Sequence, residues 1–409
     1  MNSQLKKVLT GSGLLFSAMM IVNVLNYGYA LVLGRLFGPV AYGAYASFIS
    51  LFLLVSLLPL TLQQVTAKFA ASKTSVAGFS SRLALASGII FGLALLLLAQ
   101  PLSPIIKLPA SWLMGLGVFL PLYALMGTGR GEAQGEQAFV VLGSNMVLEH
   151  ALKIALTPLA LFFAPAASGA VLATLAAVPV TTFQLRRFFR LKLKSLMSPQ
   201  EVGKYAAPIF VNLSAQAIII NTDVLLVNAL LSSEEAGIYA AVALIGRIVF
   251  YGSWAISAAI FPMVAARAAE GKPHLDLLYI ALGAVAFISL GVTGFCALFP
   301  KFVIGILFGQ AYLAGISLIA PYALMTTLYS LANVVSNHYL ALGSHKAGYW
   351  PLFAALIQVS LILGFHSTSL DIIWMQMLAK GGLLALLLMG ASVGWFNKSQ
   401  LKGARYVLR

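Results

Sequence analysis

Five charged side chains lie within long apolar stretches of this sequence, where charge is costly. A charged side chain at the centre of a bilayer costs roughly 2.5–3.5 kcal/mol to insert, so it needs a partner or a water-filled cavity. Buried carboxylates bind protons or cations, whereas buried guanidinium and ammonium groups bind anions such as phosphates. The five candidates for chemistry are Glu149, Lys153, Asp223, Arg247 and Lys380.

Asp223 has two interpretations. In the functional one it is an ion-coupling carboxylate, protonated or sodium-bound in one conformation of the protein. In the structural one it is the static partner of Arg247 or Lys380. A Lys380 ammonium facing Asp223 would take the place of a sodium ion, which favours coupling to protons or to no ion.

The basic candidates are predicted to bind an anionic substrate. The planar guanidinium of Arg247 can grip a pyrophosphate with two N–H donors, or else pair with Asp223. Lys380 adds positive charge to the same predicted substrate site, and so does Arg35, at the outer mouth. Glu149 and Lys153 are one helical turn apart with the glutamate first, an order that favours a structural ion pair between them.

Uncharged polar residues recur at helical spacing. Asn23 and Asn26 lie three residues apart, and Asn333 and Asn337 lie four apart, so each pair shares one helix face. Sugars need such donors and acceptors, which makes all four candidate substrate-binding residues. Hydrogen bonds between neighbouring helices are the alternative.

The apolar stretches that contain these residues predict an all-α polytopic membrane protein. Of the 409 residues 61% are hydrophobic and 9% are charged, whereas soluble domains carry about 25% charged residues. Stretches of about 20 apolar residues predict transmembrane helices. We predict twelve of them, at 12–33, 42–62, 83–100, 111–128, 138–163, 167–185, 206–230, 236–261, 275–299, 311–341, 349–366 and 371–395.

The charge pattern predicts the orientation of these helices. The net charge is +15, and most of the 25 basic residues fall in alternate loops, as expected for cytoplasmic loops of a membrane protein. We therefore predict a multi-pass protein of the cell inner membrane with both termini cytoplasmic, and no nucleic-acid partner. The sequence has one cysteine, no Walker loop and no His or Cys cluster with metal-ligand spacing, so we predict no cofactor, no metal site and no enzymatic activity.

An internal repeat divides the chain into two halves. GPVAYGAYA at Gly38–Ala46 and SSEEAGIYA at Ser232–Ala240 both place Gly-x-Tyr at the start of a span. Six spans per half give both halves the same orientation, which is typical of transporters with parallel repeats. We predict an N-terminal lobe at 1–185, a basic cytoplasmic linker at 186–205, and a C-terminal lobe at 206–409.

Four segments carry a family resemblance. They are LGRLFGPVAYGAYASF at Leu33–Phe48, NTDVLLVNALLSSEEAGIYAAV at Asn221–Val242, FPMVAAR at Phe261–Arg267 and LFGQAYLAG at Leu307–Gly315. These resemble polysaccharide repeat-unit flippases (Wzx-type O-antigen exporters) of the MOP superfamily. The resemblance implies two six-helix bundles around a central cavity, alternating access, and an acidic residue in the seventh helix, where Asp223 lies.

The resemblance also implies a function. Its substrates are oligosaccharide repeat units on undecaprenyl pyrophosphate, moved across the inner membrane for O-antigen, capsule or exopolysaccharide synthesis. The expected partners are this lipid-linked oligosaccharide, membrane lipids, a polysaccharide polymerase and a chain-length regulator. The alternative is a multidrug or cation antiporter of the same superfamily, and a distant third is a membrane polysaccharide polymerase or ligase.

Overall fold

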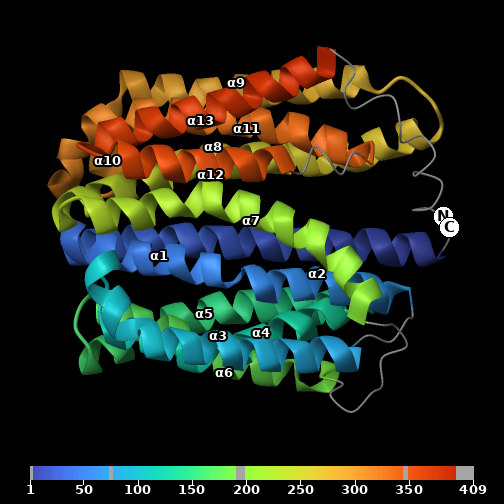
Figure 1. Ribbon diagram of the computed structural model, residues 1–409, viewed down its shortest axis with the longest axis horizontal. Helices are drawn as coiled ribbons and strands as arrows, with labels where there is room; N and C mark the ends of the chain where they lie inside the picture. Colours follow the sequence, from blue (N-terminus) through green and yellow to red (C-terminus); the bar gives the residue numbers. More distant parts are fainter. Residues whose placement is uncertain (1–2, 73–76, 190–198, 344–348, 393–409) are drawn as a thin grey trace. The chain divides into compact units, whose positions relative to one another are not determined.

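The structure is a computed structural model that describes residues 3–72, 77–189, 199–343 and 349–392. Over these residues it contains helices and no strands, which confirms the predicted all-α fold. Contacts within the chain divide it into two compact units, Met1–Leu213 (unit 1) and Ser214–Arg409 (unit 2). Figure 1 labels their helices in chain order.

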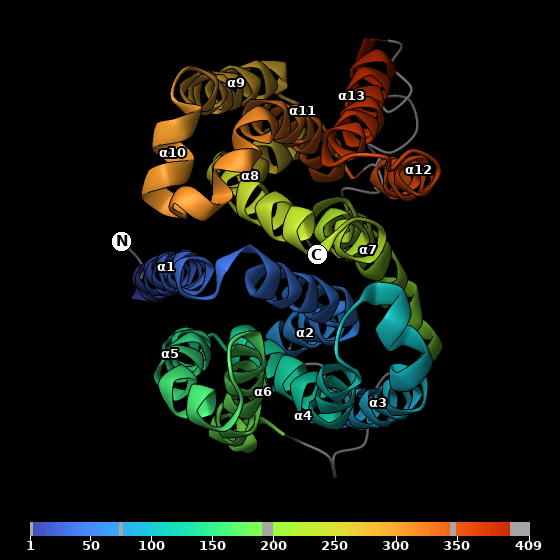
Figure 2. The same cartoon turned by 90° about the vertical axis from the view of Figure 1, so that its left-hand side faces the viewer.

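Unit 1 is a bundle of helices joined by short connections. Viewed nearly along the helices in Figure 2, α3, α4, α6 and α5 stand next to one another, in agreement with their mutual contacts. The elements are α1 (Ser3–Val55), α2 (Leu57–Ala71), α3 (Ala77–Ile106), α4 (Ala110–Gly135), α5 (Phe139–Phe163), α6 (Ala167–Gln184), the short 3-10 helix η1 (Arg186–Phe188) and the first part of α7 (Pro199–Leu230).

A kink in α1 stands where the first two predicted spans were separated by a loop. Gly38 has φ 73° and ψ 176°, a backbone conformation that favours glycine, and Pro39 follows it. Proline fits the first turn of a helix because the N–H it lacks has no partner there. The chain therefore bends at Gly38 and resumes as a helix, and Arg35 lies within α1 just before the bend rather than in a loop.

Glycines let α4 approach α2 closely. Cβ atoms built on Gly127, Gly131 and Gly135 would lie 2.6, 2.5 and 2.5 Å from backbone carbonyl oxygens of α2. The three glycines are spaced by four residues, so they share one face of α4. This small-residue face resembles those that pack membrane helices against each other.

The boundary between the units falls within α7. The start of α7 packs in unit 1, where Val202 joins a cluster with Val65 and Phe69 of α2. The Lys68 ammonium lies 3.6 Å from the centre of the Tyr205 ring. The division at residues 213 and 214 thus comes after the predicted linker at 186–205, of which residues 190–198 lie outside the described residues.

Unit 2 has α8 and α11 at its core. The end-on view of Figure 2 shows α11 beside α8, α9 and α13, and α11 contacts each of these three helices. The rings of Phe250 in α8 and Tyr329 in α11 stack with centroids 5.2 Å apart. The elements after α7 are α8 (Ser233–Ala269), α9 (Leu275–Leu298), α10 (Pro300–Leu307), the 3-10 helix η2 (Gln310–Gly315), α11 (Ile316–Ala341), α12 (Tyr349–Gly364) and α13 (Ser369–Ser392).

The repeat motif in unit 2 begins with a capped helix. Ser232 and Glu235 form a capping box, in which the Ser232 hydroxyl accepts from the Glu235 N–H and the Glu235 carboxylate accepts from the Ser232 N–H. This fixes the first turn of α8, and with it the position of Tyr239 one turn further on.

The helices match the predicted spans. Ten helices in the described part of the chain are long and apolar enough to cross a membrane, and α12 and the end of α8 are shorter apolar helices. The first predicted span lies in α1, and the second begins in α1 and ends in α2. The tenth covers most of η2 and all of α11, and each of the other later spans corresponds to one helix. The last predicted span, 371–395, runs past the end of the described residues at 392.

Candidate functional site

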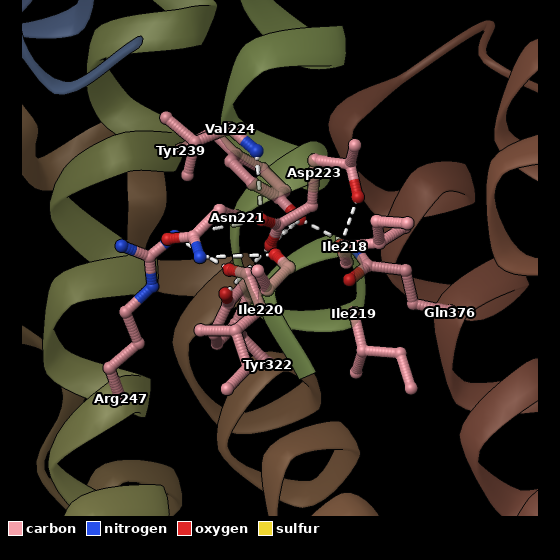
Figure 3. Close-up of polar contacts among 12 residues, drawn as sticks. Ile218, Ile219, Ile220, Asn221, Asp223, Val224, Tyr239, Arg247, Tyr322 and Gln376 are labelled. Carbon is pink, nitrogen blue, oxygen red and sulfur yellow. Dashed lines mark hydrogen bonds and ion pairs between the residues drawn. The ribbon is translucent and has the colours of Figure 1, made fainter. Parts of the chain in front are cut away.

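Asp223 lies at the centre of a hydrogen-bonded cluster in unit 2. It is fully buried. Its Oδ2 accepts from the hydroxyl of Tyr322 at 2.8 Å and from that of Tyr239 at 3.1 Å, and its Oδ1 accepts from the Val224 N–H at 2.8 Å. Figure 3 shows these side chains converging on the carboxylate from α7, α8 and α11. Three donors compensate the removal of this carboxylate from water.

Arg247 lies at the edge of the same cluster. Its Nη2 is 3.7 Å from Asp223 Oδ1 and donates to the Ile220 carbonyl oxygen at 2.8 Å. The Arg247 side chain keeps 15% of its surface exposed, whereas that of Asp223 keeps 1%. The two side chains therefore form the ion pair expected of the structural interpretation, and the Arg247 side chain remains partly exposed.

Lys380 reaches Asp223 only through two other side chains. Its ammonium donates to Gln376 Oε1 at 3.0 Å and to Met325 Sδ at 2.8 Å. Gln376 Nε2 in turn donates to the Tyr239 hydroxyl at 2.7 Å, and that hydroxyl donates to Asp223. A Lys380 ammonium directly facing Asp223 was one of the alternatives expected from the sequence, but in the structure Lys380 is linked to Asp223 through Gln376 and Tyr239.

The Tyr322 ring occupies space that Gly246 leaves open. A Cβ atom at Gly246 would overlap the Tyr322 ring. The glycine is therefore needed for the Tyr322 hydroxyl to reach Asp223. Sequence reasoning did not single out Tyr322, Gln376 or Gly246, although a glutamine in an otherwise apolar helix is a usable signal for Gln376.

In unit 1 the expected ion pair has a different partner. The Glu149 carboxylate pairs with Arg130 at 2.6 Å and not with Lys153. Arg130 lies beyond the predicted fourth span, but α4 continues to Gly135 and buries it, and its Nε donates to Asn145 at 2.7 Å. The Arg130 guanidinium donates to Glu149 and Asn145 at the same time. Its planar set of N–H donors suits this double contact better than the ammonium of Lys153.

Lys153 therefore has no carboxylate within ion-pair distance among the described residues. Its ammonium donates to Asn26 Oδ1 at 2.8 Å and lies 4.8 Å from the centre of the Tyr29 ring. The Tyr29 hydroxyl is 2.7 Å from the Thr157 hydroxyl. Lys153 is 8% exposed, so this ammonium is almost entirely buried.

The internal repeat relates the two sites. Asp223 precedes Tyr239 by 16 residues, and Tyr29 precedes Tyr45 by the same interval. The Tyr29 and Tyr45 rings meet edge to face at 6.1 Å. Unit 1 thus has a tyrosine at the repeat position where unit 2 has its buried carboxylate.

The other predicted site residues lie outside these clusters. Asn23 is half-buried in α1 and Arg35 is exposed. In α11, Asn333 is buried and Asn337 lines a small enclosed cavity with His338. The described part of the chain contains no group of three or more His, Cys, Asp or Glu residues placed to hold a metal ion.

Solved structures with the same fold are described as transporters. An inward-facing multidrug resistance MATE family transporter of the MOP superfamily is 17% identical, with 94% of this chain and 99% of that one covered and a TM-score of 0.77. This chain has the same fold as that transporter. No protein-family model matches the sequence, and no curated protein matches it either.

Two further MOP-fold structures differ in their described functions. A MOP superfamily transporter from Pyrococcus furiosus, whose description reports a binding pocket of reversed polarity and a different function, is 18% identical, with 95% and 96% of the chains covered and a TM-score of 0.63. The multidrug transporter DinF-BH, solved in complex with a ligand, is 17% identical, with 94% and 96% covered and a TM-score of 0.67.

Proposed function

We propose that this protein flips undecaprenyl-pyrophosphate-linked oligosaccharides across the cell inner membrane by alternating access, for O-antigen, capsule or exopolysaccharide synthesis. The observation that carries this proposal is the pair of buried lysines, Lys153 and Lys380. Over the described residues, neither ammonium has a carboxylate within ion-pair distance. A buried cation without a counter-ion favours an anionic ligand.

The surroundings of the two lysines are alike. Lys153 donates to an asparagine oxygen and lies near the Tyr29 ring, while Lys380 donates to a glutamine oxygen with its ammonium 5.8 Å from the centre of the Tyr329 ring. Amide oxygens and ring faces hold an ammonium without neutralising its charge. Each unit therefore contains one buried positive charge suited to a phosphate group, and unit 2 also contains the partly exposed Arg247.

A multidrug or cation antiporter is the second candidate function. The solved structures of this fold favour it, because several are described as multidrug transporters. A cationic cargo, however, needs carboxylates that are available to it. Asp223 and Glu149 already face Arg247 and Arg130, so these two carboxylates suit cation export poorly.

Asp223 is the coupling group in this proposal. Its oxygens accept three hydrogen bonds and face a guanidinium, which leaves little room for the several oxygen ligands that a sodium ion needs. A proton needs one lone pair. We therefore propose that protonation of Asp223 accompanies one conformation of the transport cycle.

Mass spectrometry of the lipids that co-purify with the protein tests the cargo. The flippase proposal predicts a polyprenyl pyrophosphate carrying sugars, and it predicts that the lipid is lost from a Lys153→Met/Lys380→Met double variant. A preparation that carries no such lipid but binds organic cations supports the antiporter instead. The polymerase and the chain-length regulator are the proteins to seek as partners in the same membrane.

A further inference from the structure

We propose that Gln376 couples the protonation of Asp223 to the release of the Lys380 ammonium for anion binding. The inference rests on the proposed function, in which Asp223 takes the proton and Lys380 contacts the phosphate of the cargo. It is carried by one chain of hydrogen bonds that joins Lys380, Gln376, Tyr239 and Asp223 over distances of 3.0, 2.7 and 3.1 Å.

The direction of donation along this chain is fixed at both ends. An ammonium has donors only, so Gln376 must present its carbonyl oxygen to Lys380 and its NH₂ group to Tyr239. The Tyr239 oxygen accepts that N–H, which leaves the Tyr239 O–H to donate to the carboxylate. An ionised carboxylate only accepts, so every bond in the chain points toward Asp223.

The chain is shielded from water. Asp223, Tyr239 and Gln376 have no exposed surface, and Lys380 is 4% exposed. Figure 3 shows Asp223, Tyr239 and Gln376 gathered at one place among the helices of unit 2. Because water does not substitute for a lost partner here, a change at one end of the chain alters the bonding at the other.

Protonation of Asp223 reverses the polarity of the chain. A proton taken up from water turns Asp223 into a donor to the Tyr239 oxygen, so the Tyr239 O–H turns toward Gln376 and needs an oxygen there. The Gln376 amide satisfies this by rotating through half a turn, which brings its NH₂ group against the Lys380 ammonium. Donor then faces donor, and among the described residues Lys380 keeps only the weak Met325 sulfur as an acceptor.

The other charged and titratable groups at the site lie beside this chain and not within it. Arg247 of α8 is 3.7 Å from Asp223 Oδ1, and Tyr322 of α11 donates to Oδ2. Near the other end, the Tyr329 ring lies 5.8 Å from the Lys380 ammonium. These three contacts do not join Asp223 to Lys380, so the hydrogen-bonded path between the two ends runs through Tyr239 and Gln376.

The expected behaviour is linked binding. Protonation of Asp223 frees Lys380 and tightens anion binding, and anion binding must raise the proton affinity of Asp223 by the same factor. Anion affinity therefore increases as the pH falls. Couplings of this kind amount to roughly 5- to 150-fold in affinity, so we expect binding about tenfold tighter when Asp223 is protonated than when it is ionised.

The test measures binding of farnesyl pyrophosphate to the full chain in lipid nanodiscs at pH 6 and pH 8. The wild type is compared with Gln376→Leu, which interrupts the chain of hydrogen bonds. For each protein the affinity at pH 6 is divided by that at pH 8, and comparing the two quotients removes the contribution from titration of the probe's own phosphates. Gln358→Leu is the matched control, because Gln358 is equally buried in the same unit but donates to the Ile219 carbonyl oxygen outside the chain.

Two isosteric variants extend the test should the leucine variant fail to fold. Asp223→Asn resembles the protonated carboxyl group, so it should bind the probe tightly at both pH values. Gln376→Glu should hold Lys380 in an ion pair and bind weakly at both. Wild-type binding whose pH ratio equals that of Gln376→Leu would overturn this inference and leave the anionic cargo intact, whereas a wild type that does not bind the probe would overturn both.

Discussion

The oxygens of Asp223 are fully engaged, so its protonation must be accompanied by rearrangement of its neighbours. Two tyrosine hydroxyls and one backbone N–H donate to it, and a guanidinium lies 3.7 Å away. Gaining a proton turns one of its accepting positions into a donor. At the scale of single residues, the transport proposal depends on this change of Asp223 from acceptor to donor.

Replacing Asp223 should stop transport without unfolding the protein. Asp223→Asn keeps the shape and the hydrogen bonding of a protonated carboxyl group but no longer cycles its charge. We expect a loss of transport of at least about tenfold at normal levels of folded protein. Flipping in proteoliposomes, with size-exclusion chromatography as the check on folding, measures this, and wild-type flipping by the variant contradicts the coupling role.

The guanidinium of Arg247 should not be replaceable by an ammonium. Arg247→Lys retains the charge but loses the planar guanidinium that donates to the Ile220 carbonyl oxygen and can present two parallel N–H donors to a phosphate. We expect flipping to fall severalfold, with the larger change in apparent affinity for the cargo. Full activity of this variant in the same assay would count against phosphate clamping.

The stability of unit 1 should depend on Arg130 and Glu149 as a pair. Removing one partner of a buried ion pair costs roughly 3–5 kcal/mol, because the other charge is left buried alone. Glu149→Gln and Arg130→Met should therefore couple strongly in a double-mutant cycle of unfolding free energies. The matched cycle of Glu149→Gln with Lys153→Met should show a much smaller coupling energy. A larger coupling energy for Glu149 with Lys153 than with Arg130 would contradict the Arg130 pairing and support the pair expected from sequence.

At the scale of helices, close packing of α4 on α2 positions the Arg130 site. The face of α4 made of Gly127, Gly131 and Gly135 meets the α2 backbone, and Arg130 lies on the same stretch of α4. Residues that contact α2 therefore alternate along α4 with Arg130, which contacts α5. A change on the glycine face is expected to reach the ion pair.

A methyl group on that face should separate the two helices. Gly131→Ala places its Cβ 2.5 Å from the Gln63 carbonyl oxygen, a backbone atom that cannot move aside easily. Overpacking of this kind costs about 1–3 kcal/mol. Thermal unfolding of the variant in detergent measures the effect. Gly28→Ala in α1, where a Cβ meets nothing within 4 Å, is the control and should not lower the unfolding temperature, because alanine is the better helix former.

Local sequence patterns were sufficient to place the helices but not their partners. The apolar stretches predicted each span, because burial of about 20 residues in a bilayer leaves a strong compositional signal. The Gly-x-Tyr repeat pointed to Tyr45 and Tyr239. The Arg130 pairing, the role of Gln376 and the Tyr322 bond to Asp223 depend on which helices pack together, which one sequence does not reveal.

At the scale of the whole molecule, the chain combines a fold found in multidrug transporters with charges suited to an anion. The fold is that of MATE transporters, at sequence identities below 20%. Folds host many functions, so the cargo must be argued from the site. Lys153 in unit 1 and Lys380 in unit 2 are the residues that set this chain apart from a cation exporter in our account.

The most direct test is a flipping assay in proteoliposomes that offers both cargoes. Vesicles containing the purified protein receive a fluorescent undecaprenyl-pyrophosphate-linked sugar, and parallel vesicles receive a fluorescent organic cation of the rhodamine class. We predict that a pH gradient across the vesicle membrane accelerates the crossing of the lipid-linked sugar. Lys153→Met and Lys380→Met should each slow this crossing, and the organic cation should not be moved. Transport of the rhodamine cation with no movement of the lipid-linked sugar would contradict the account.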